Sequence, residues 1–145
     1  MNFLLDTNVV SEWIKPRPNA GVVSWLHETD EDRTFLSVIT LTESRYGVER
    51  MPVGNPRVRL DDWIVNELPL RFEGRILPIN PMVADVCGRI VARSEAAGRR
   101  MEVADAFIAA TANVHRLTVV TRNVSELEVA ITNILNPWNQ NLFQS

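Results

Sequence analysis

Short apolar runs alternate with longer amphipathic stretches along the whole chain, and this alternation is the feature that most constrains the fold. The apolar runs have the length of buried strands, whereas the stretches between them carry apolar residues at helical spacing. Strands separated by helices pair in parallel through right-handed crossovers. The pattern therefore predicts an α/β fold, in which helices cover both faces of a twisted, mostly parallel sheet of about 4–5 strands.

The individual elements follow from the same reading. Strands are predicted at residues 3–5, 34–37, 75–79 and 117–121, with a last edge strand at residues 131–135. Helices are predicted over residues 9–14, from a cap at Asn19, and over residues 38–51, 57–72, 81–97 and 102–115. Pro69 is expected to fray or kink the end of the helix that contains it, because proline removes a helical hydrogen bond. The tail after Trp138 is polar and is expected to be loose.

Length and composition indicate one ordinary globular domain over residues 1–145, since domains usually hold about 100–200 residues. Hydrophobic residues make up 46% of the chain, but no run approaches the ~18 apolar residues of a membrane span. The N-terminus meets Asp6 almost at once and lacks a basic region, so it does not resemble a secretory signal. The single cysteine, Cys87, excludes an intramolecular disulfide, and a cytoplasmic setting is expected.

The charge balance argues against binding nucleic acid through bulk charge. Fifteen basic and eighteen acidic residues give a net charge of −3, whereas such binders are basic. Lys15 is the only lysine, and the other fourteen basic residues are arginines. Any nucleic-acid contact must therefore be local, and something must offset the acidic total.

Polar side chains follow several predicted strands, where ligands of such sheets bind. Asp6 ends the first strand, Glu43 lies in the helix after the second, and Asp105 lies near the start of the helix before residues 117–121. Asn123 follows that strand by two residues. These four residues could meet at one edge of the sheet.

Each acid also has a structural interpretation. Asp6 could cap the next helix, and Thr40 with Glu43 has the spacing of a capping box. Asp105 lies in a helix that is apolar nearly all round, so we expect it to be buried and to need a partner or a metal. Glu102 is either a further acid on that face or an ordinary helix-start residue.

Gathered carboxylates need a cation. Two carboxylates ~4 Å apart repel each other by about 4 kcal/mol at an effective dielectric constant of 20. Oxygen ligands without nearby Cys or His favour Mg²⁺ or Mn²⁺ over Zn²⁺. Such an ion can lower the pKa of a water molecule and stabilise a leaving oxygen, so the pattern predicts hydrolysis of phosphodiester bonds.

Five ordered motifs spread over nearly the whole chain carry a family resemblance: residues 4–12 (LLDTNVVSE), 41–47 (LTESRYG), 105–112 (DAFIAATA), 121–123 (TRN) and 136–138 (NPW). Together they resemble the PIN-domain ribonuclease toxins of the VapC type, including the FitB-like branch. The resemblance implies a three-layer α/β/α sandwich and endoribonuclease activity that depends on Mg²⁺ or Mn²⁺. It implies that the chain is the toxin of a type II toxin–antitoxin system.

The same resemblance assigns roles to residues. It implies that Asp6, Glu43 and Asp105 hold the metal. The family's next acid often stands where this chain has Asn123, so a second metal site is in doubt, and Glu126 could partly substitute. Thr121 would orient a water molecule or a carboxylate, and Asn8 would brace the site.

Partners are implied as well. VapC-type toxins are neutralised by a cognate VapB-type antitoxin, whose C-terminal segment wraps the toxin and places a basic residue in the acidic site. The pair binds operator DNA only through the antitoxin, and toxin homodimers are the family norm. Trp13, Trp25 and Trp63 could serve a dimer surface, although core packing is the expected use of most of them. Candidate contacts to RNA phosphates are Arg17, Arg45, Arg50 and Arg122, although ordinary surface charge is the more common role of each such residue.

Other functional classes fit less well. A receiver-type phosphoacceptor needs a lysine after a late strand, whereas Lys15 lies early. The glycine-rich motifs that cradle nucleotide phosphates are missing from the sequence. The serious alternative is a catalytically inactive PIN module that binds a protein or RNA without cutting, and Asn123 is the feature that favours it.

Overall fold

A five-stranded parallel sheet forms the centre of the molecule. The computed structural model describes residues 1–139. The strands lie in the order β3-β2-β1-β4-β5, and every neighbouring pair is parallel. Their bounds are β1 Phe3–Leu5, β2 Thr34–Ser37, β3 Ile76–Leu77, β4 Thr118–Val120 and β5 Ile134–Leu135. The predicted parallel sheet is therefore confirmed, with β5 at one edge.

Helices fill the connections between the strands. The α-helices are α1 Thr7–Trp13, α2 Ala20–Glu28, α3 Val38–Glu49, α4 Asn55–Asp62, α5 Leu68–Arg71, α6 Pro81–Ala96, α7 Val103–His115 and α8 Val124–Leu127. Short helical turns of other types are η1 Glu31–Arg33, η2 Trp63–Glu67 and η3 Pro137–Asn139. Asn19 caps α2 as predicted, since its side chain accepts hydrogen bonds from the amides of Gly21 and Val22.

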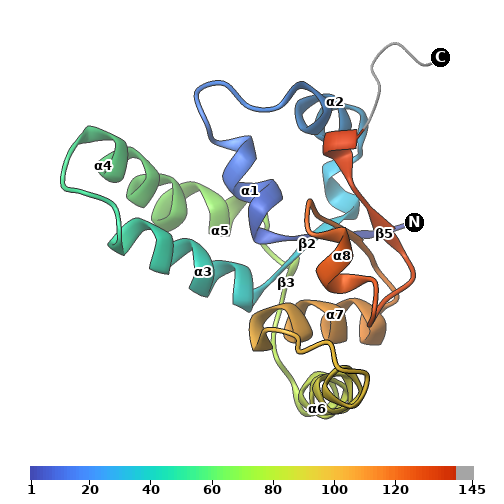
Figure 1. Ribbon diagram of the computed structural model, residues 1–145. Helices are drawn as coiled ribbons and strands as arrows, with labels where there is room; N and C mark the ends of the chain where they lie inside the picture. The colour runs from blue at the N-terminus through green and yellow to red at the C-terminus, as the bar shows by residue number, and fades with distance from the viewer. Residues whose placement is uncertain (140–145) are drawn as a thin grey trace.

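Two separate hydrophobic cores lie on the two faces of the sheet. Leu4 of β1 packs in one core with residues of α6, α7 and α8, whereas the next residue, Leu5, packs in the other with residues of α1, α2 and α5. Successive strand residues point to opposite faces, so a strand buried on both sides is apolar at every position. Figure 1 shows α6 and α7 on one side of the strands and α1 and α2 on the other. The predicted three-layer α/β/α sandwich is confirmed.

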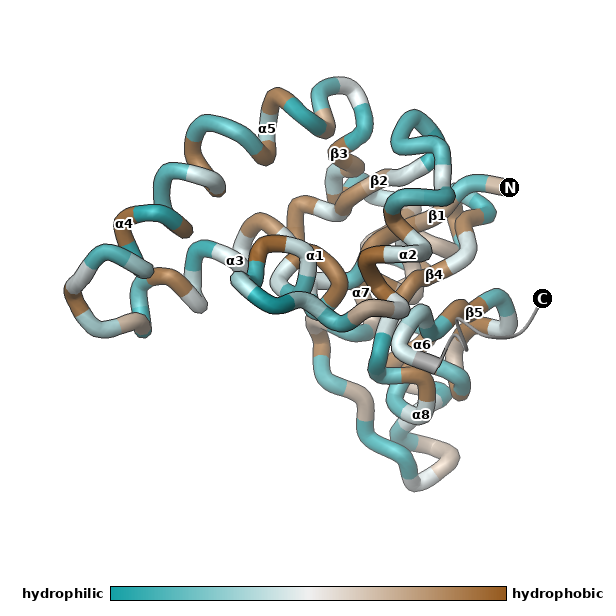
Figure 2. Tube along the Cα trace, turned by 90° about the horizontal axis from the view of Figure 1, so that it is seen from above, coloured by the Kyte–Doolittle hydropathy of each residue, from teal (hydrophilic) through white to brown (hydrophobic). Residues whose placement is uncertain are grey.

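One predicted helix is interrupted. Residues 57–72 form α4, η2 and α5, and η2 is a π-helical turn in which the Leu68 amide donates to the Trp63 carbonyl. Pro69 has no amide hydrogen and its ring crowds the preceding turn, so the wide turn directly before it fits the predicted irregularity. Both ribbon and tube show α3 and α4 extending together beyond the edge of the sheet (Figures 1 and 2).

The three tryptophans pack against the core as expected, with Trp13 and Trp63 half-buried. Trp25 is buried, and Trp13 stacks edge-on against both Trp63 and Phe72. In the described part of the chain, none of the helices is both long and apolar enough to cross a membrane. The tail after Trp138 was predicted to be loose. Apart from Asn139, that tail comprises residues 140–145, which lie outside the described residues.

Candidate active site

The carboxyl edge of the sheet holds a hollow of about 340 Å³ that we call the acidic hollow. Asp6 reaches it from the end of β1, Glu43 from α3 and Asp105 from α7. Asn123, which follows β4, lines the same hollow. The structure thus brings together the four residues that the sequence placed at the strand ends.

Asp6 is buried and tightly held. Its side chain is only 4% exposed, the Thr7 amide donates to Oδ1 (2.8 Å), and the Thr121 hydroxyl donates to Oδ2 (2.8 Å). Asp6 therefore caps α1, as its structural interpretation predicted, while it also faces the hollow. Burial raises the pKa of its carboxyl, the two hydrogen bonds oppose that rise, and the charge of Glu43 adds to it.

Glu43 is tied to the start of α1 through a threonine. The Thr7 hydroxyl donates to Glu43 Oε1 at 2.6 Å. The capping-box interpretation of Thr40 and Glu43 is wrong, because the cap of α3 is Ser37, whose hydroxyl accepts from the Ile39 amide. Glu43 lies a full turn inside the helix and is free to point at the hollow.

Asp105 lies in the first turn of α7 and is half-buried, whereas the sequence predicted a buried carboxylate. The helix exposes this edge because the hollow opens beside it. Burial and the charges of four nearby carboxylates raise the pKa of the Asp105 carboxyl to about 6. These carboxylates are, in falling order of effect, Asp6, Glu43, Glu126 and Glu102.

Thr121 is the hub of the supporting hydrogen bonds. Besides donating to Asp6, its hydroxyl accepts from the Asn123 amide (2.9 Å) and from Asn8 Nδ2 (3.3 Å). Asn8 Oδ1 accepts from the Arg122 amide (3.2 Å). Glu126 is exposed and lines a neighbouring hollow with Asp105, not the acidic hollow. Thr121 and Asn8 thus sit where bracing residues are needed, whereas Glu126 acts on the site through its charge.

The chemistry of the lining fits a hard cation. Carboxylates, an amide and hydroxyls supply only oxygen ligands here, and the lining contains neither His nor Cys within the described residues. As the side chains stand, the described chain holds no group of three or more His, Cys, Asp or Glu arranged to bind an ion. Burial and the charges of neighbouring carboxylates both raise the pKa values of Asp6 and Asp105, and a cation bound between these side chains would oppose that rise.

Of the four arginines proposed to contact RNA, only Arg122 lines the acidic hollow. Its guanidinium lies 5.6 Å from the centre of the Trp138 ring. Arg45 is ion-paired with Asp61, Arg50 lies over the Tyr46 ring, and Arg17 is exposed away from the lining. The RNA contacts of these four arginines stay predictions, and Arg122 is the one that shares a cavity with the acids.

The sequence reading missed several residues of the hollow. Thr7, Ser11, Glu12, Lys15 and Trp138 all line it. Glu12, in the last turn of α1, and Lys15, just after the helix, form an ion pair of 2.9 Å. The sequence carried a signal for this pair, because acidic and basic residues three apart at a helix end can lie side by side.

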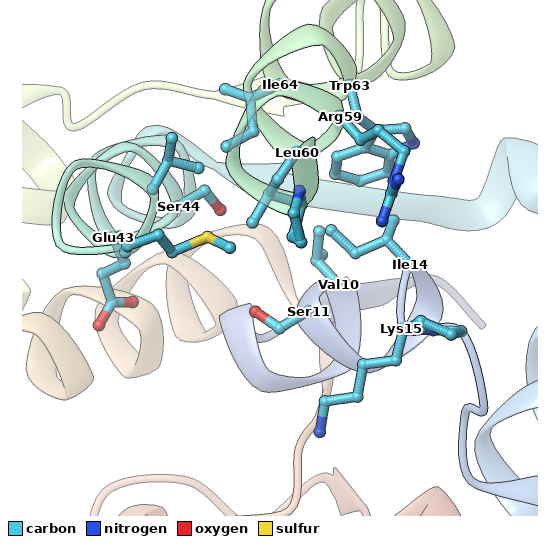
Figure 3. Close-up of a pocket in the computed structure, with 15 residues that line it drawn as sticks. Val10, Ser11, Ile14, Lys15, Glu43, Ser44, Arg59, Leu60, Trp63 and Ile64 are labelled. Atoms are coloured by element: carbon cyan, nitrogen blue, oxygen red, sulfur yellow. The ribbon is translucent and has the colours of Figure 1, made fainter. Parts of the chain in front are cut away.

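An apolar pocket of about 530 Å³ lies beside the acidic hollow. α1, α3, α4 and η2 enclose it, and Ser11, Lys15 and Glu43 line both cavities. Figure 3 shows the charged groups of Glu43 and Lys15 pointing away from the apolar side chains. The main apolar lining residues are Val10, Ile14, Val48, Leu60, Trp63 and Ile64.

The PIN domain family model matches residues 3–130. The chain belongs to the PIN-domain family. The predicted resemblance is thereby confirmed, and each of the five motifs contributes at least one residue to the acidic hollow.

Curated relatives cover almost the whole PIN domain described here. The chain is 39% identical over 135 residues to the plasmid stability protein StbB of Pseudomonas syringae pv. tomato, covering 93% of this chain and 97% of the relative. It is 38% identical to the toxin FitB of Neisseria gonorrhoeae, over 94% of this chain and 98% of that one. It is 35% identical to VapC ribonuclease Y4jK of Sinorhizobium fredii, over 93% of this chain and 96% of that one.

Solved structures agree with these relatives. A chain in the structure of FitAB bound to the IR36 DNA fragment superposes with a TM-score of 0.88 at 36% identity, over 98% of this chain and 99% of that one. The crystal structure of FitAcB from Neisseria gonorrhoeae gives a TM-score of 0.88 at 38% identity, over 95% and 99%. The PIN fold of this chain is therefore that of the FitB and VapC branch.

Proposed function

We propose that this PIN protein is the toxin of a type II toxin–antitoxin system and acts as an endoribonuclease dependent on Mg²⁺ or Mn²⁺. The observation that carries the proposal is the convergence of Asp6, Glu43 and Asp105 from three separate elements on one hollow. Relatives named as a toxin and as a VapC ribonuclease support the same function. The substrate is RNA, and the reaction is hydrolysis of a phosphodiester bond.

Asp6, Glu43 and Asp105 would hold the ion, with Asn123 offering an amide oxygen or a bond to a water molecule. A bound ion of this kind lowers the pKa of a water molecule and stabilises the oxygen that leaves. The Asp6 carboxylate is oriented before substrate binds, because the Thr121 hydroxyl and the Thr7 amide each donate a hydrogen bond to one of its oxygens. Glu43 is oriented by the Thr7 hydroxyl.

A cognate VapB-type antitoxin is the proposed protein partner. The solved relatives include FitAB and VapBC complexes, some of them bound to DNA, which supports contact with operator DNA through the antitoxin. The apolar pocket adjoins the acidic hollow and can take an apolar antitoxin segment whose basic residue enters the hollow. Arginine suits the acidic hollow because its guanidinium group pairs with carboxylates. The homodimer remains a prediction.

Sequencing of RNA 5′ ends after brief expression without antitoxin tests the proposed activity. New ends should appear with the wild-type chain and be missing with Asp6→Ala at equal abundance and folding. Growth arrest should also vanish in Asp6→Ala. Asn123 favours the second candidate, an inactive PIN module, because an uncharged amide replaces an acid. Identical ends from wild type and Asp6→Ala would support that candidate and reject hydrolysis.

A further inference from the structure

We propose that Lys15, held in place by Glu12, binds a phosphate of the RNA next to the bond that is cut. The inference rests on the proposed ribonuclease function and adds to it a residue that positions the substrate. Lys15 is the only lysine of the chain and lines the acidic hollow together with Asp6, Glu43 and Asp105. No family motif used above assigns it a role.

The buried Glu12 side chain holds the Lys15 ammonium group in place. The Glu12 side chain is only 9% exposed, Oε1 accepts from Lys15 Nζ (2.9 Å) and Oε2 accepts from the Asn19 amide (2.8 Å). A buried carboxylate with both oxygens engaged has little freedom to move. Glu12 therefore also anchors the loop between α1 and α2 that carries Lys15.

The backbone of Lys15 is restrained as well. Its amide donates to the Glu12 carbonyl (3.2 Å), and the following Pro16 limits the conformations that Lys15 can adopt. A cation that is ordered before the substrate arrives loses less entropy on binding. This arrangement suits a group that positions a ligand better than it suits a mobile surface lysine.

The ammonium group still has donors to offer. The Lys15 side chain is 57% exposed, and among the described residues the one hydrogen bond of Nζ is to Glu12. An ammonium carries three N–H donors, so two remain for an incoming anion. Figure 3 shows the ammonium turned away from the apolar pocket, with which only its stem is in contact.

The charge of the hollow explains why such a cation is needed. Four carboxylates line it, namely Asp6, Glu12, Glu43 and Asp105, against the two cations Lys15 and Arg122. A divalent ion held by Asp6, Glu43 and Asp105 would offset only part of this excess. A polyanion then needs a positive group at the rim, where it can hold a phosphate without displacing the ion.

The competing explanation is that Lys15 only neutralises the buried Glu12. Stability measurements cannot separate the two, because both predict some loss of stability when Lys15 is removed. The salt dependence of RNA binding can distinguish the two explanations. A lysine that contacts a phosphate releases a counterion from RNA, whereas a lysine that serves only Glu12 releases none.

The experiment measures binding of a short fluorescein-labelled single-stranded RNA by anisotropy, in Ca²⁺ and over a series of KCl concentrations, with RNA integrity checked on gels. Lys15→Ala should weaken binding about tenfold. It should also reduce the salt slope, d log K/d log[KCl], by about 0.7 in magnitude, the value for one phosphate on a single strand. In Mn²⁺ cleavage assays KM should rise about tenfold while kcat changes little.

Three further variants sharpen the result. Arg89→Ala removes one positive charge from an exposed pair with Asp85 on α6 and should leave affinity and slope unchanged. Glu12→Gln should weaken binding in the wild-type background but not in the Lys15→Ala background, because Glu12 acts through Lys15. If Lys15→Ala fails to fold, Glu12→Gln/Lys15→Gln removes both charges and should show the same loss of slope.

An unchanged salt slope and KM in a folded Lys15 variant would overturn the inference. If the wild-type chain binds RNA with the Lys15-dependent slope but cuts no RNA in Mn²⁺, the ribonuclease proposal fails and the phosphate contact stands. If the wild-type chain cuts RNA and the Lys15 variants match it, the ribonuclease proposal stands and the Lys15 inference fails.

Discussion

The Thr121 hydroxyl donates a hydrogen bond of 2.8 Å to Asp6 Oδ2, although the two residues are 115 positions apart in the chain. Parallel pairing of β1 with β4 sets Leu5 opposite Val120, so the residues that follow these strands emerge side by side. The Asp6 amide also donates to the Val120 carbonyl (3.0 Å). The strand register therefore orients the central carboxylate of the site.

Thr121→Val should lower the free energy of unfolding by about 1–2 kcal/mol, because it leaves a buried carboxylate without one of its donors. It should also raise the pKa of Asp6 further, since that hydrogen bond lowers it. Denaturant unfolding measures the first effect. Thr118→Val, in the strand that Thr121 follows and only partly buried, is the control and should change stability by less than about 0.5 kcal/mol. Equal losses in both variants would contradict the role of the hydrogen bond.

Asp105→Asn should abolish cleavage yet stabilise the metal-free protein at pH 7. The pKa of Asp105 rises from 3.8 to about 6 on folding, so the folded state binds more protons and stability falls as pH rises through that window. The gain at pH 7 should be about 1–2 kcal/mol, below the roughly 3 kcal/mol of the full shift, because solvent screens a half-buried group. The gain should vanish below about pH 4, where Asp105 is neutral in both states. Unfolding curves at pH 4 and pH 7 measure it, and a clear loss at pH 7 would favour a structural role for Asp105.

Mn²⁺ should raise the melting temperature of the wild-type chain by roughly 5–10 °C at a hundredfold excess over its Kd, because only the folded state gathers the carboxylates. Asp6→Ala should lose most of this shift, whereas Asp85→Ala, which removes an exposed acid of α6, should keep it. Differential scanning calorimetry with and without Mn²⁺ measures the shift. A wild-type chain that does not respond to Mn²⁺ would indicate the inactive module.

Cleavage should fall steeply as the pH drops below about 6. Asp105 must be ionised to hold the cation, and its pKa of about 6 means that a proton competes with the ion in this range. The logarithm of kcat/KM at subsaturating Mn²⁺ should then approach a slope of about 1 per pH unit below pH 6. Raising the Mn²⁺ concentration should move the break to lower pH. A profile that is flat between pH 5 and pH 7 would exclude Asp105 as a ligand.

Gly21→Ala should destabilise the fold by about 1–3 kcal/mol, as overpacking does. A Cβ at this position would lie 2.4 Å from the Pro137 carbonyl oxygen, at the contact between α2 and η3 that holds Trp138 beside the hollow. Gly88→Ala, in α6, has nothing within 4 Å and should instead stabilise by about 0.5–1 kcal/mol through helix propensity. Thermal melts compare the two, and equal effects would show that the close approach of α2 and η3 is relaxed in solution.

The order of strands and helices could be predicted because each element is short and leaves a local pattern. Leu4 and Leu5 are both apolar because β1 is buried on both faces, and Asn19 caps α2 through contacts within three residues. The element ends shifted by a few residues, and the π-helical turn of η2 was not foreseen beyond the irregularity at Pro69. In this turn the Leu68 amide donates to the carbonyl five residues earlier, not four, and the spacing of apolar residues does not reveal such a change.

The sequence predicted some residues of the candidate site and not others. Asp6, Glu43, Asp105 and Asn123 were found because parallel strands bring their carboxyl ends to one edge, a rule that needs no coordinates. Glu12, Lys15 and Trp138 were not predicted to line the hollow, and of the four arginines predicted to contact RNA only Arg122 lines it. Charge on a surface residue says nothing of its direction until the elements beside it are packed.

The sequence by itself determined the α/β class, the family and the acids that end the strands, because these depend on local periodicity and on motifs written within a few residues. Only the tertiary structure decided which side chains share the hollow and how strongly they repel one another. Asp105 acquires its raised pKa first from burial and then from carboxylates on other elements and its neighbour Glu102, and Thr121 reaches Asp6 because of the strand register. Such properties arise from distances through space, which the order of residues along the chain does not specify.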